Sequence, residues 1–327
     1  MNPVAVTGGE PAGIGLELAP ALRAATGGRI PFFVLADPRH CAAAFGDTAV
    51  VEIDAPEDTA AAMARGVPVL PVPFDGERIP GRPDPRNARG VIAAIERAVS
   101  LVMDGAASAI TTLPIAKKAL KDGAGFPFPG HTEFLAHLAG VSRVVMMLAC
   151  PELRVVPATI HIPLAEVPQT LDAALLEGTL RVTDDALRRD FGIAEPTIAV
   201  AGLNPHAGEG GAMGREEIEL IAPVLDALRA DGLRLLGPLA ADTMFHARAR
   251  AGYDAAVAMY HDQALIPIKT IDFSGGVNVT LGLPFVRTSP DHGTAFDIAG
   301  TGTADPSSTI AALKMAWQMA RARHGRN

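Results

Sequence analysis

Three histidines stand where this sequence could build a metal centre. His161 follows the β-branched run "RVVPATI", His206 follows "TIAVAGLNP" and His261 follows "AAVAMY". Each run predicts a short buried strand, so each imidazole comes just after the end of a strand. Ligands of open α/β sheets bind at the carboxyl ends of the strands. Three neutral imidazoles gathered there would suit Zn²⁺ or a similar divalent ion and would leave room for a substrate.

The residues alone leave a plainer interpretation open, because a single histidine is more often a packing or surface residue than a ligand. The stretch "MYHDQALIPIK" around His261 could equally be a capped loop with a surface lysine. Asp242 and Asp262 are candidates for the carboxylates that orient metal ligands. We treat His40, His137, His246 and His324 as packing or surface residues.

A second group of side chains could hold an anion. His131 and Thr132 in "FPGHTEF" precede a predicted helix, whose first backbone N–H groups favour negative charge. Lys269, Asn278 and Arg287 lie in a stretch with few other charges, and a phosphate or carboxylate would use such donors. The alternative is a helix cap together with a solvated lysine and arginine.

The elements that must position these groups alternate between strands and helices. "PVAVTGGEPAGIGLELAPAL" predicts a strand, a Gly-rich turn and a helix, and "GREEIELIAPVLDALRADG" predicts a long helix. Apolar residues repeat at helical spacing from Val91 to Val102, and the tail after "DPSS" is also predicted to be helical. Residues 54–90 are rich in Pro and Gly and predict an irregular crossing. The alternation indicates an α/β fold with a largely parallel sheet, and crossings between two lobes are expected near residues 130 and 275.

Bulk properties exclude several classes of function. The 327-residue chain has a formal net charge of −8, which argues against a nucleic-acid or anionic-membrane surface. Cys41 and Cys150 give neither a disulfide framework nor a zinc spacing. The N-terminus has no secretory pattern and no apolar run approaches membrane-spanning length, so we expect a cytoplasmic protein. No G-x-G-x-x-G is present, which leaves a Rossmann dinucleotide site unsupported but does not exclude NAD.

Longer motifs give the chain a resemblance to a known family. They are "GEPAGIG", "FPGHTEFLA", "HIPLAEVP", "GLNPHAGEGGAMGREE", "GPLAADTMF", "YHDQALIPIKT", "GVNVTLGLPFVRTSPDHGTAFDIAGTG" and "ADPSS". In this order, over nearly the whole chain, they resemble the 4-hydroxythreonine-4-phosphate dehydrogenase family of pyridoxal phosphate (vitamin B6) biosynthesis.

The resemblance implies a fold and an assembly. The fold would be two α/β/α lobes around a cleft, as in isocitrate and isopropylmalate dehydrogenases. Residues 1–130 plus 275–327 would form the cofactor-side lobe, and residues 131–274 the metal-binding and dimerisation lobe. The protein would be a homodimer with active sites shared between its chains.

The resemblance also implies site residues, all named here at matching motif positions. The metal ligands would be His161, His206 and His261. The substrate contacts would be His131, Thr132, Lys269, Asn278 and Arg287. The cofactor side would include Gly13, His292, Gly293 and Asp297. The catalytic candidates are Asp242, Asp262 and Lys269, and the base could be Asp242, Asp262 or a metal-bound water.

The implied reaction is NAD- or NADP-dependent oxidation of 4-phosphohydroxy-L-threonine to 2-amino-3-oxo-4-phosphooxybutanoate, which loses CO₂ to give 3-amino-2-oxopropyl phosphate. A divalent ion, with Zn²⁺, Mg²⁺ and Co²⁺ as the leading candidates, would lower the pKa of the substrate hydroxyl and polarise the new ketone. Within the family, 4-phospho-D-threonate or 4-phospho-D-erythronate is the main alternative substrate, and a cis-dihydrodiol dicarboxylate without phosphate is a weaker one. A non-catalytic metal-dependent binding protein is the alternative from another class.

Overall fold

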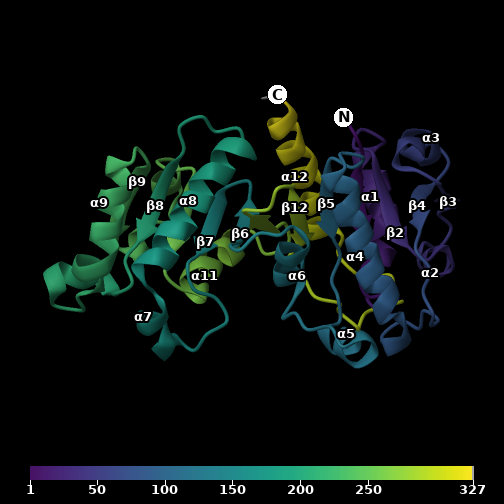
Figure 1. Ribbon diagram of the computed structural model, residues 1–327, viewed down its shortest axis with the longest axis horizontal. Coiled ribbons are helices and arrows are strands. Elements are labelled where there is room, and N and C mark those ends of the chain that lie inside the picture. The colour runs from purple at the N-terminus through teal and green to yellow at the C-terminus, as the bar shows by residue number, and fades with distance from the viewer. Residues whose placement is uncertain (326–327) are drawn as a thin grey trace. The chain divides into compact units, whose positions relative to one another are not determined.

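The chain folds into two compact α/β units, each a sheet with helices packed against it (Figure 1). The computed structural model describes residues 1–325, of which residues 1–142 and 283–325 form unit 1 and residues 143–282 form unit 2. The predicted α/β layers are therefore confirmed. The last two residues of the predicted C-terminal helix, 326–327, lie outside the described residues.

The sheet of unit 1 has the strand order β3-β4-β2-β1-β5-β12. The pairs β1 with β2, β1 with β5, β2 with β4, β3 with β4 and β12 with β5 are all parallel. Its strands are β1 Val4–Thr7, β2 Phe32–Ala36, β3 Val50–Glu52, β4 Val67–Pro71, β5 Ala109–Thr112 and β12 Arg287–Pro290. Runs such as "FFVLA" are buried along their whole length, as expected for parallel strands covered on both faces.

Helices cover both faces of the unit 1 sheet. They are α1 Ala19–Thr26, α2 Pro38–Ala44, α3 Thr59–Met63, α4 Ala88–Met103, α5 Lys117–Ala124, α6 His131–Leu138 and α12 Ser307–His324. The chain steps from β1 to β2 in one direction and from β4 past β1 to β5 in the other, and right-handed crossovers then put α1 and α4 on opposite faces. The predicted helix around Val91 and Ile95 is confirmed as α4, with both side chains buried.

Two expectations for unit 1 differ from the structure. The predicted irregular crossing at residues 54–90 is wrong in part, because the segment contains α3 and β4, whose apolar run "VPVL" is buried between β2 and β3. The predicted lobe boundary at 130/131 also differs from the observed one at 142/143. The reason is that α6 packs into unit 1, where its Phe134 ring lies 5.0 Å from that of Phe126.

The sheet of unit 2 has the strand order β11-β6-β7-β10-β8-β9. The pairs β7 with β10, β10 with β8 and β8 with β9 are parallel, whereas β6 is antiparallel to both β7 and β11. Its strands are β6 Val145–Cys150, β7 Leu153–Pro157, β8 Thr197–Ala201, β9 Arg234–Leu239, β10 Ala255–Ala258 and β11 Val277–Leu281. Because β11 pairs with β6 over its whole length, the second boundary falls at 282/283 and not at the predicted 274/275.

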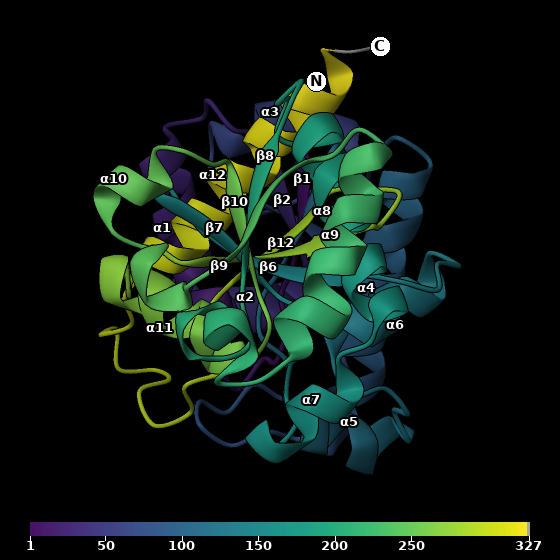
Figure 2. The same ribbon diagram turned by 90° about the vertical axis from the view of Figure 1, so that its left-hand side faces the viewer.

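The helices of unit 2 are α7 Val167–Thr170, α8 Ala173–Arg189, α9 Ala222–Ala230, α10 Ala247–Arg250 and α11 His261–Ile271. In Figure 2, α8 and α9 lie to the right of the unit 2 strands and α11 to their left. Small side chains such as Ala256, Ala258 and Ala264 let α11 pack closely on β7 and β10. Among residues 1–325, no helix combines the length and the apolar character needed to cross a membrane.

Each sheet has one point where the direction of the crossovers reverses. In unit 1 this point lies between β1 and β5, and in unit 2 it lies at β10, whose connection runs back past β7 to β11 whereas the connections after β7 and β8 run towards β9. The carboxyl ends of the strands at such a switch point leave a crevice in which α/β proteins bind ligands. Functional side chains are therefore expected at these two places.

Candidate active site

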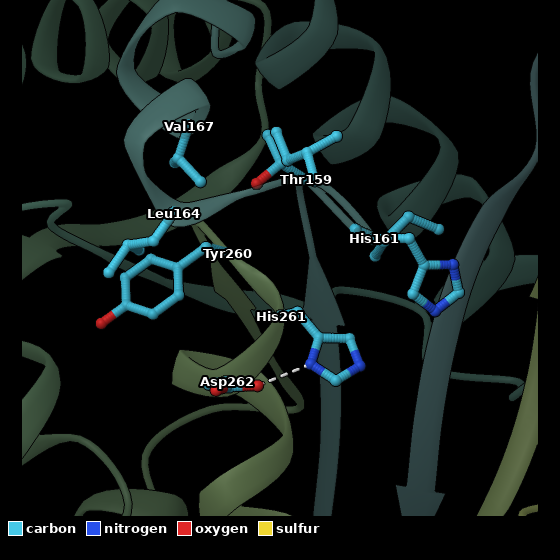
Figure 3. A pocket seen from close by; sticks show the side chains of 9 residues that line it. Thr159, His161, Leu164, Val167, Tyr260, His261 and Asp262 are labelled. Atoms are coloured by element: carbon cyan, nitrogen blue, oxygen red, sulfur yellow. Dashed lines mark hydrogen bonds and ion pairs between the residues drawn. The ribbon is translucent and has the colours of Figure 1, made fainter.

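The switch point of unit 2 brings two of the three predicted metal ligands together. The backbone N–H and the Oγ1 hydroxyl of Thr159 both donate to the carbonyl of Met259, over 3.2 and 2.8 Å, and so tie the end of β7 to the end of β10. His161 and His261 follow these two residues, and their ring centroids lie 5.7 Å apart. Figure 3 shows the two imidazoles next to one another at the edge of the pocket.

Asp262 contacts one of these imidazoles. Its Oδ1 lies 2.7 Å from Nδ1 of His261, the interaction drawn as a dashed line in Figure 3. A carboxylate on Nδ1 holds the proton there and leaves Nε2 as the nitrogen available to a metal. The adjoining cavity of about 240 Å³ is lined by Thr159, Ile160, His161, Ile162, Leu164, Val167, Tyr260, His261 and Asp262.

His206, the third predicted ligand, lies on the loop that follows the neighbouring strand β8. The buried Glu217 accepts the backbone N–H of Asn204 over 2.7 Å, and the Asn204 amide donates to Glu216 over 2.7 Å, which fixes the start of this loop. Gln263 links the loop to β10, since it accepts the N–H of Met259 over 2.7 Å and donates to the carbonyl of Gly202 over 2.8 Å.

Backbone conformation sets two of the three histidines apart. His161 and His206 have φ of 54° and 53°, in the left-handed region that non-glycine residues seldom adopt. The loop after His206 continues with Ala207 and Glu209 at φ of 51° and 42°. Such strain persists only where the surrounding structure requires it, and it clusters at ligand-binding sites.

The three histidines do not form a closed ligand set in this structure. The side chain of His206 is 63% exposed, and its Nδ1 lies 3.3 Å from Oε2 of Glu209. Within residues 1–325, three ligand atoms from His, Cys, Asp or Glu residues come within 4.8 Å of one another at Cys150, Glu152 and Asp272 instead.

That second cluster has poor chemistry for a catalytic ion. Burial raises the pKa of the Cys150 thiol, whereas a metal binds the thiolate. Asp272 already accepts the N–H of Gly275 over 2.7 Å, just after the end of α11. The spacing of Cys150 and Glu152 in the sequence does not predict this cluster. Asp272 comes close to them only because α11 packs against β6.

The residues predicted to bind an anion belong to different units, and those of unit 1 form a buried cationic group. Arg287 on β12 is 3% exposed and donates from Nη2 to Oγ1 of Thr112 over 2.6 Å. Burial lowers the pKa of Arg287 to about 10, so the guanidinium stays charged at neutral pH. His131, the first residue of α6, has a buried Nε2 without a hydrogen-bond partner among residues 1–325. Thr132 follows it in the first turn of the helix.

The pKa of His131 predicts a pH effect on stability. Burial lowers this pKa well below its usual value, and the positive charges of Arg287 and Lys117 add to the effect. The unfolded chain therefore binds more protons below about pH 6.5, and the free energy of unfolding should fall as the pH falls through that range. We expect His131→Gln to reduce this slope by up to about 1.4 kcal/mol per pH unit.

Urea denaturation between about pH 7.5 and about pH 5 would measure the slope. His137→Gln is the matched control, because His137 is an exposed residue of the same helix. Equal slopes for the wild type and His131→Gln would contradict the assignment of a neutral His131.

Lys269 and Asn278, the remaining predicted substrate contacts, belong to unit 2. Lys269 lies in the last turn of α11 with Nζ 5.1 Å from the centroid of the Phe273 ring. Oδ1 of Asn278 on β11 is buried and has no hydrogen-bond partner among residues 1–325. Asp242, a candidate base, is exposed on a single turn at Ala241–Thr243 and lines a second cavity together with Asp262.

The predicted cofactor residues lie at and beside the switch point of unit 1. The Gly-rich turn after β1 is fixed to the loop after β5, since the N–H of Glu10 donates to Pro114 over 2.8 Å. A Cβ at Gly13 would lie 2.8 Å from the carbonyl of Thr294, which follows the predicted residues His292 and Gly293. Nε2 of His292 lies 3.0 Å from Oγ1 of Thr309. Asp297 is exposed in the same loop.

Comparison with known proteins shows the family to which the chain belongs. The family model described as "Pyridoxal phosphate biosynthetic protein PdxA" matches residues 30–316. A 4-hydroxythreonine-4-phosphate dehydrogenase of Paracoccus denitrificans is 60% identical over 98% of this chain and 99% of its own length. The crystal structure of the Klebsiella pneumoniae protein of that name has a TM-score of 0.88 and 38% identity, covering 98% of this chain and all of its own.

A more distant structure carries a different name. The terephthalate 1,2-cis-dihydrodiol dehydrogenase of Burkholderia xenovorans has a TM-score of 0.69 and 29% identity, covering 97% of this chain and 98% of its own. The family match and the full-length relative nevertheless assign the chain clearly. It belongs to the PdxA family of 4-hydroxythreonine-4-phosphate dehydrogenases, which are oxidoreductases of pyridoxal phosphate biosynthesis.

Proposed function

We propose that the protein oxidises 4-phosphohydroxy-L-threonine with NAD or NADP to 2-amino-3-oxo-4-phosphooxybutanoate, which decarboxylates to 3-amino-2-oxopropyl phosphate. The observation that carries the proposal is the pairing of His161 with His261 at the switch point of unit 2, in a chain 60% identical to a named dehydrogenase.

The donor set fits a divalent ion. His161, His206 and His261 would hold it, because all three follow parallel neighbouring strands and two of them keep a strained backbone. When bound, the ion would stabilise negative charge on the oxygen that the reaction oxidises. Asp262 would fix the tautomer of His261, and the tie between Thr159 and Met259 would keep the His161 and His261 rings at their observed separation.

The phosphate of the substrate would bind the cationic group of unit 1. Arg287 offers a charged fork in a buried environment, and Nε2 of His131, which has no partner among the described residues, can donate one further hydrogen bond. Lys269 and the buried Oδ1 of Asn278 are proposed to contact the rest of the substrate. A buried fork of this kind favours a phosphorylated substrate over a diol without phosphate.

The substrate hydroxyl must lose a proton, and Asp262 and Asp242 are the proposed acceptors. Both carboxylates are exposed, and both line one cavity of about 400 Å³ in unit 2. A nicotinamide cofactor would supply the hydride acceptor. Gly13, His292, Gly293 and Asp297 are the residues proposed to bind it, because they surround the Gly-rich turn and the loop packed against it.

We also propose a homodimer. Ile266 and Phe273, on and just after α11, are 64% and 76% exposed, and Ile266 lines the apolar cavity that contains Asp242 and Asp262. Large exposed apolar side chains around a groove are typical of subunit interfaces. Sedimentation equilibrium should give the mass of a dimer, and a monomer at all concentrations would contradict this part of the proposal.

The substrate is tested by NADH formation with 4-phosphohydroxy-L-threonine, run beside 4-phospho-D-threonate and 4-phospho-D-erythronate. We expect the highest kcat/KM with the amino acid. A higher value with either sugar acid would overturn the proposed substrate while leaving the phosphate site in place.

A further inference from the structure

A lysine that none of the motifs singled out lies beside the cationic group of unit 1. Lys117 is the first residue of α5, which follows β5 at the switch point. A Cβ placed on Gly130, the residue before α6, would lie 3.6 Å from Nζ of Lys117. Lys117 therefore reaches the start of α6, where His131 stands.

Two further observations place Lys117 in the electrostatic field of the same group. Its charge, together with that of Arg287, acts on the His131 imidazole and helps to hold the pKa of that ring down. Lys117 makes no salt bridge or hydrogen bond of its own within residues 1–325, although its neighbour Lys118 pairs with Asp122 over 2.7 Å. Lys117 is thus an exposed cation without a partner among residues 1–325, and it acts on the same imidazole as the buried guanidinium of Arg287.

The charge balance of this group depends on Lys117. Oε2 of Glu133 would lie 3.5 Å from the same Gly130 Cβ position, and its negative charge raises the pKa of Arg287. With His131 neutral, Arg287 and Glu133 cancel, and only Lys117 makes the group net positive. An anion with two negative charges needs that excess, because the carboxylate of Glu133 would otherwise repel it.

We infer that Lys117 is a further substrate-binding residue, a mobile cation that completes the phosphate site formed by Arg287 and His131. The inference rests on the proposed function for the identity of the substrate, and on the geometry of unit 1 for the binding of phosphate. The flexible stem of a lysine suits a point charge that closes onto a phosphate after it arrives.

Lys117→Ala tests the inference, with Lys118→Ala as the matched control. The two lysines are adjacent and exposed at the start of one helix, so loss of surface charge is similar in both variants. Binding of inorganic phosphate by calorimetry gives a readout independent of turnover, and KM and kcat for 4-phosphohydroxy-L-threonine give a second.

We expect Lys117→Ala to raise both the Kd for phosphate and the KM roughly three- to tenfold, with kcat and the melting temperature unchanged. Lys118→Ala should match the wild type, and Lys117→Arg should recover most of the loss. Phosphate affinity and KM unchanged in Lys117→Ala would overturn the inference.

Failure of the proposed function would look different. If the wild type does not oxidise the amino-acid substrate but Lys117→Ala still weakens phosphate binding relative to Lys118→Ala, the anion site stands and only the proposed substrate is rejected.

Discussion

Replacement of His206 by alanine is expected to lower kcat by at least ~100-fold while the protein stays folded. Loss of a residue that merely supports a metal ligand costs 10- to 100-fold in activity or affinity, so loss of a ligand should cost at least as much. His206 is exposed and lies on a loop held by Glu217 and Asn204, and its removal leaves those hydrogen bonds intact. The melting temperature of the metal-free protein should therefore change little.

The measurement is steady-state turnover together with bound metal per chain after dialysis. His246→Ala is the control, because His246 is an exposed histidine of the same unit that only caps α10. Wild-type metal content and turnover in His206→Ala would remove His206 from the centre and favour another ligand, with Glu209 the nearest carboxylate.

Replacement of Arg287 by alanine should raise KM for a phosphorylated substrate roughly 10- to 150-fold, since a charge-assisted contact contributes about 1.5–3 kcal/mol. The effect should be large because the guanidinium is buried, where water screens its charge little. The loss should appear mainly in KM, because in the proposed reaction the phosphate group is not itself oxidised.

Arg287→Ala also leaves a cavity beside Thr112, so stability must be followed with KM. Arg154→Ala is a suitable control: Arg154 is a partly buried arginine of unit 2 that donates to the Asp254 carbonyl and covers the Phe191 ring. Arg154→Ala should lower the stability of the fold without changing KM.

Arg287→Lys keeps the charge but loses the planar fork, so its KM should lie between that of the wild type and that of Arg287→Ala. An unchanged KM in Arg287→Ala would exclude Arg287 from the substrate site.

Much of the fold could be predicted from local pattern. The buried strands before His161, His206 and His261 have β-branched or small apolar runs, and the structure has β7, β8 and β10 there. The prediction that the strand ends lie close together is also confirmed for His161 and His261. They follow β7 and β10, which are parallel and therefore end at the same edge of the sheet.

Other features depend on contacts between residues far apart in sequence. The assignment of α6 to unit 1 follows from the packing of Phe134 on Phe126, which no local pattern encodes. The β4 strand lies within a Pro-rich stretch, and its place between β2 and β3 comes from tertiary pairing. The sequence alone does not predict a role for Lys117, because two adjacent lysines at the start of a helix are typical of an ordinary solvated surface.

The most direct measurement of the central claim is the location of a bound transition metal by anomalous diffraction from crystals soaked in Zn²⁺. The structure offers two competing places, the three histidines after β7, β8 and β10 and the cluster of Cys150, Glu152 and Asp272. We predict an anomalous peak bonded to nitrogen atoms of His161, His206 and His261. A peak at Cys150, Glu152 and Asp272, with the three imidazoles unligated, would contradict the proposed metal centre.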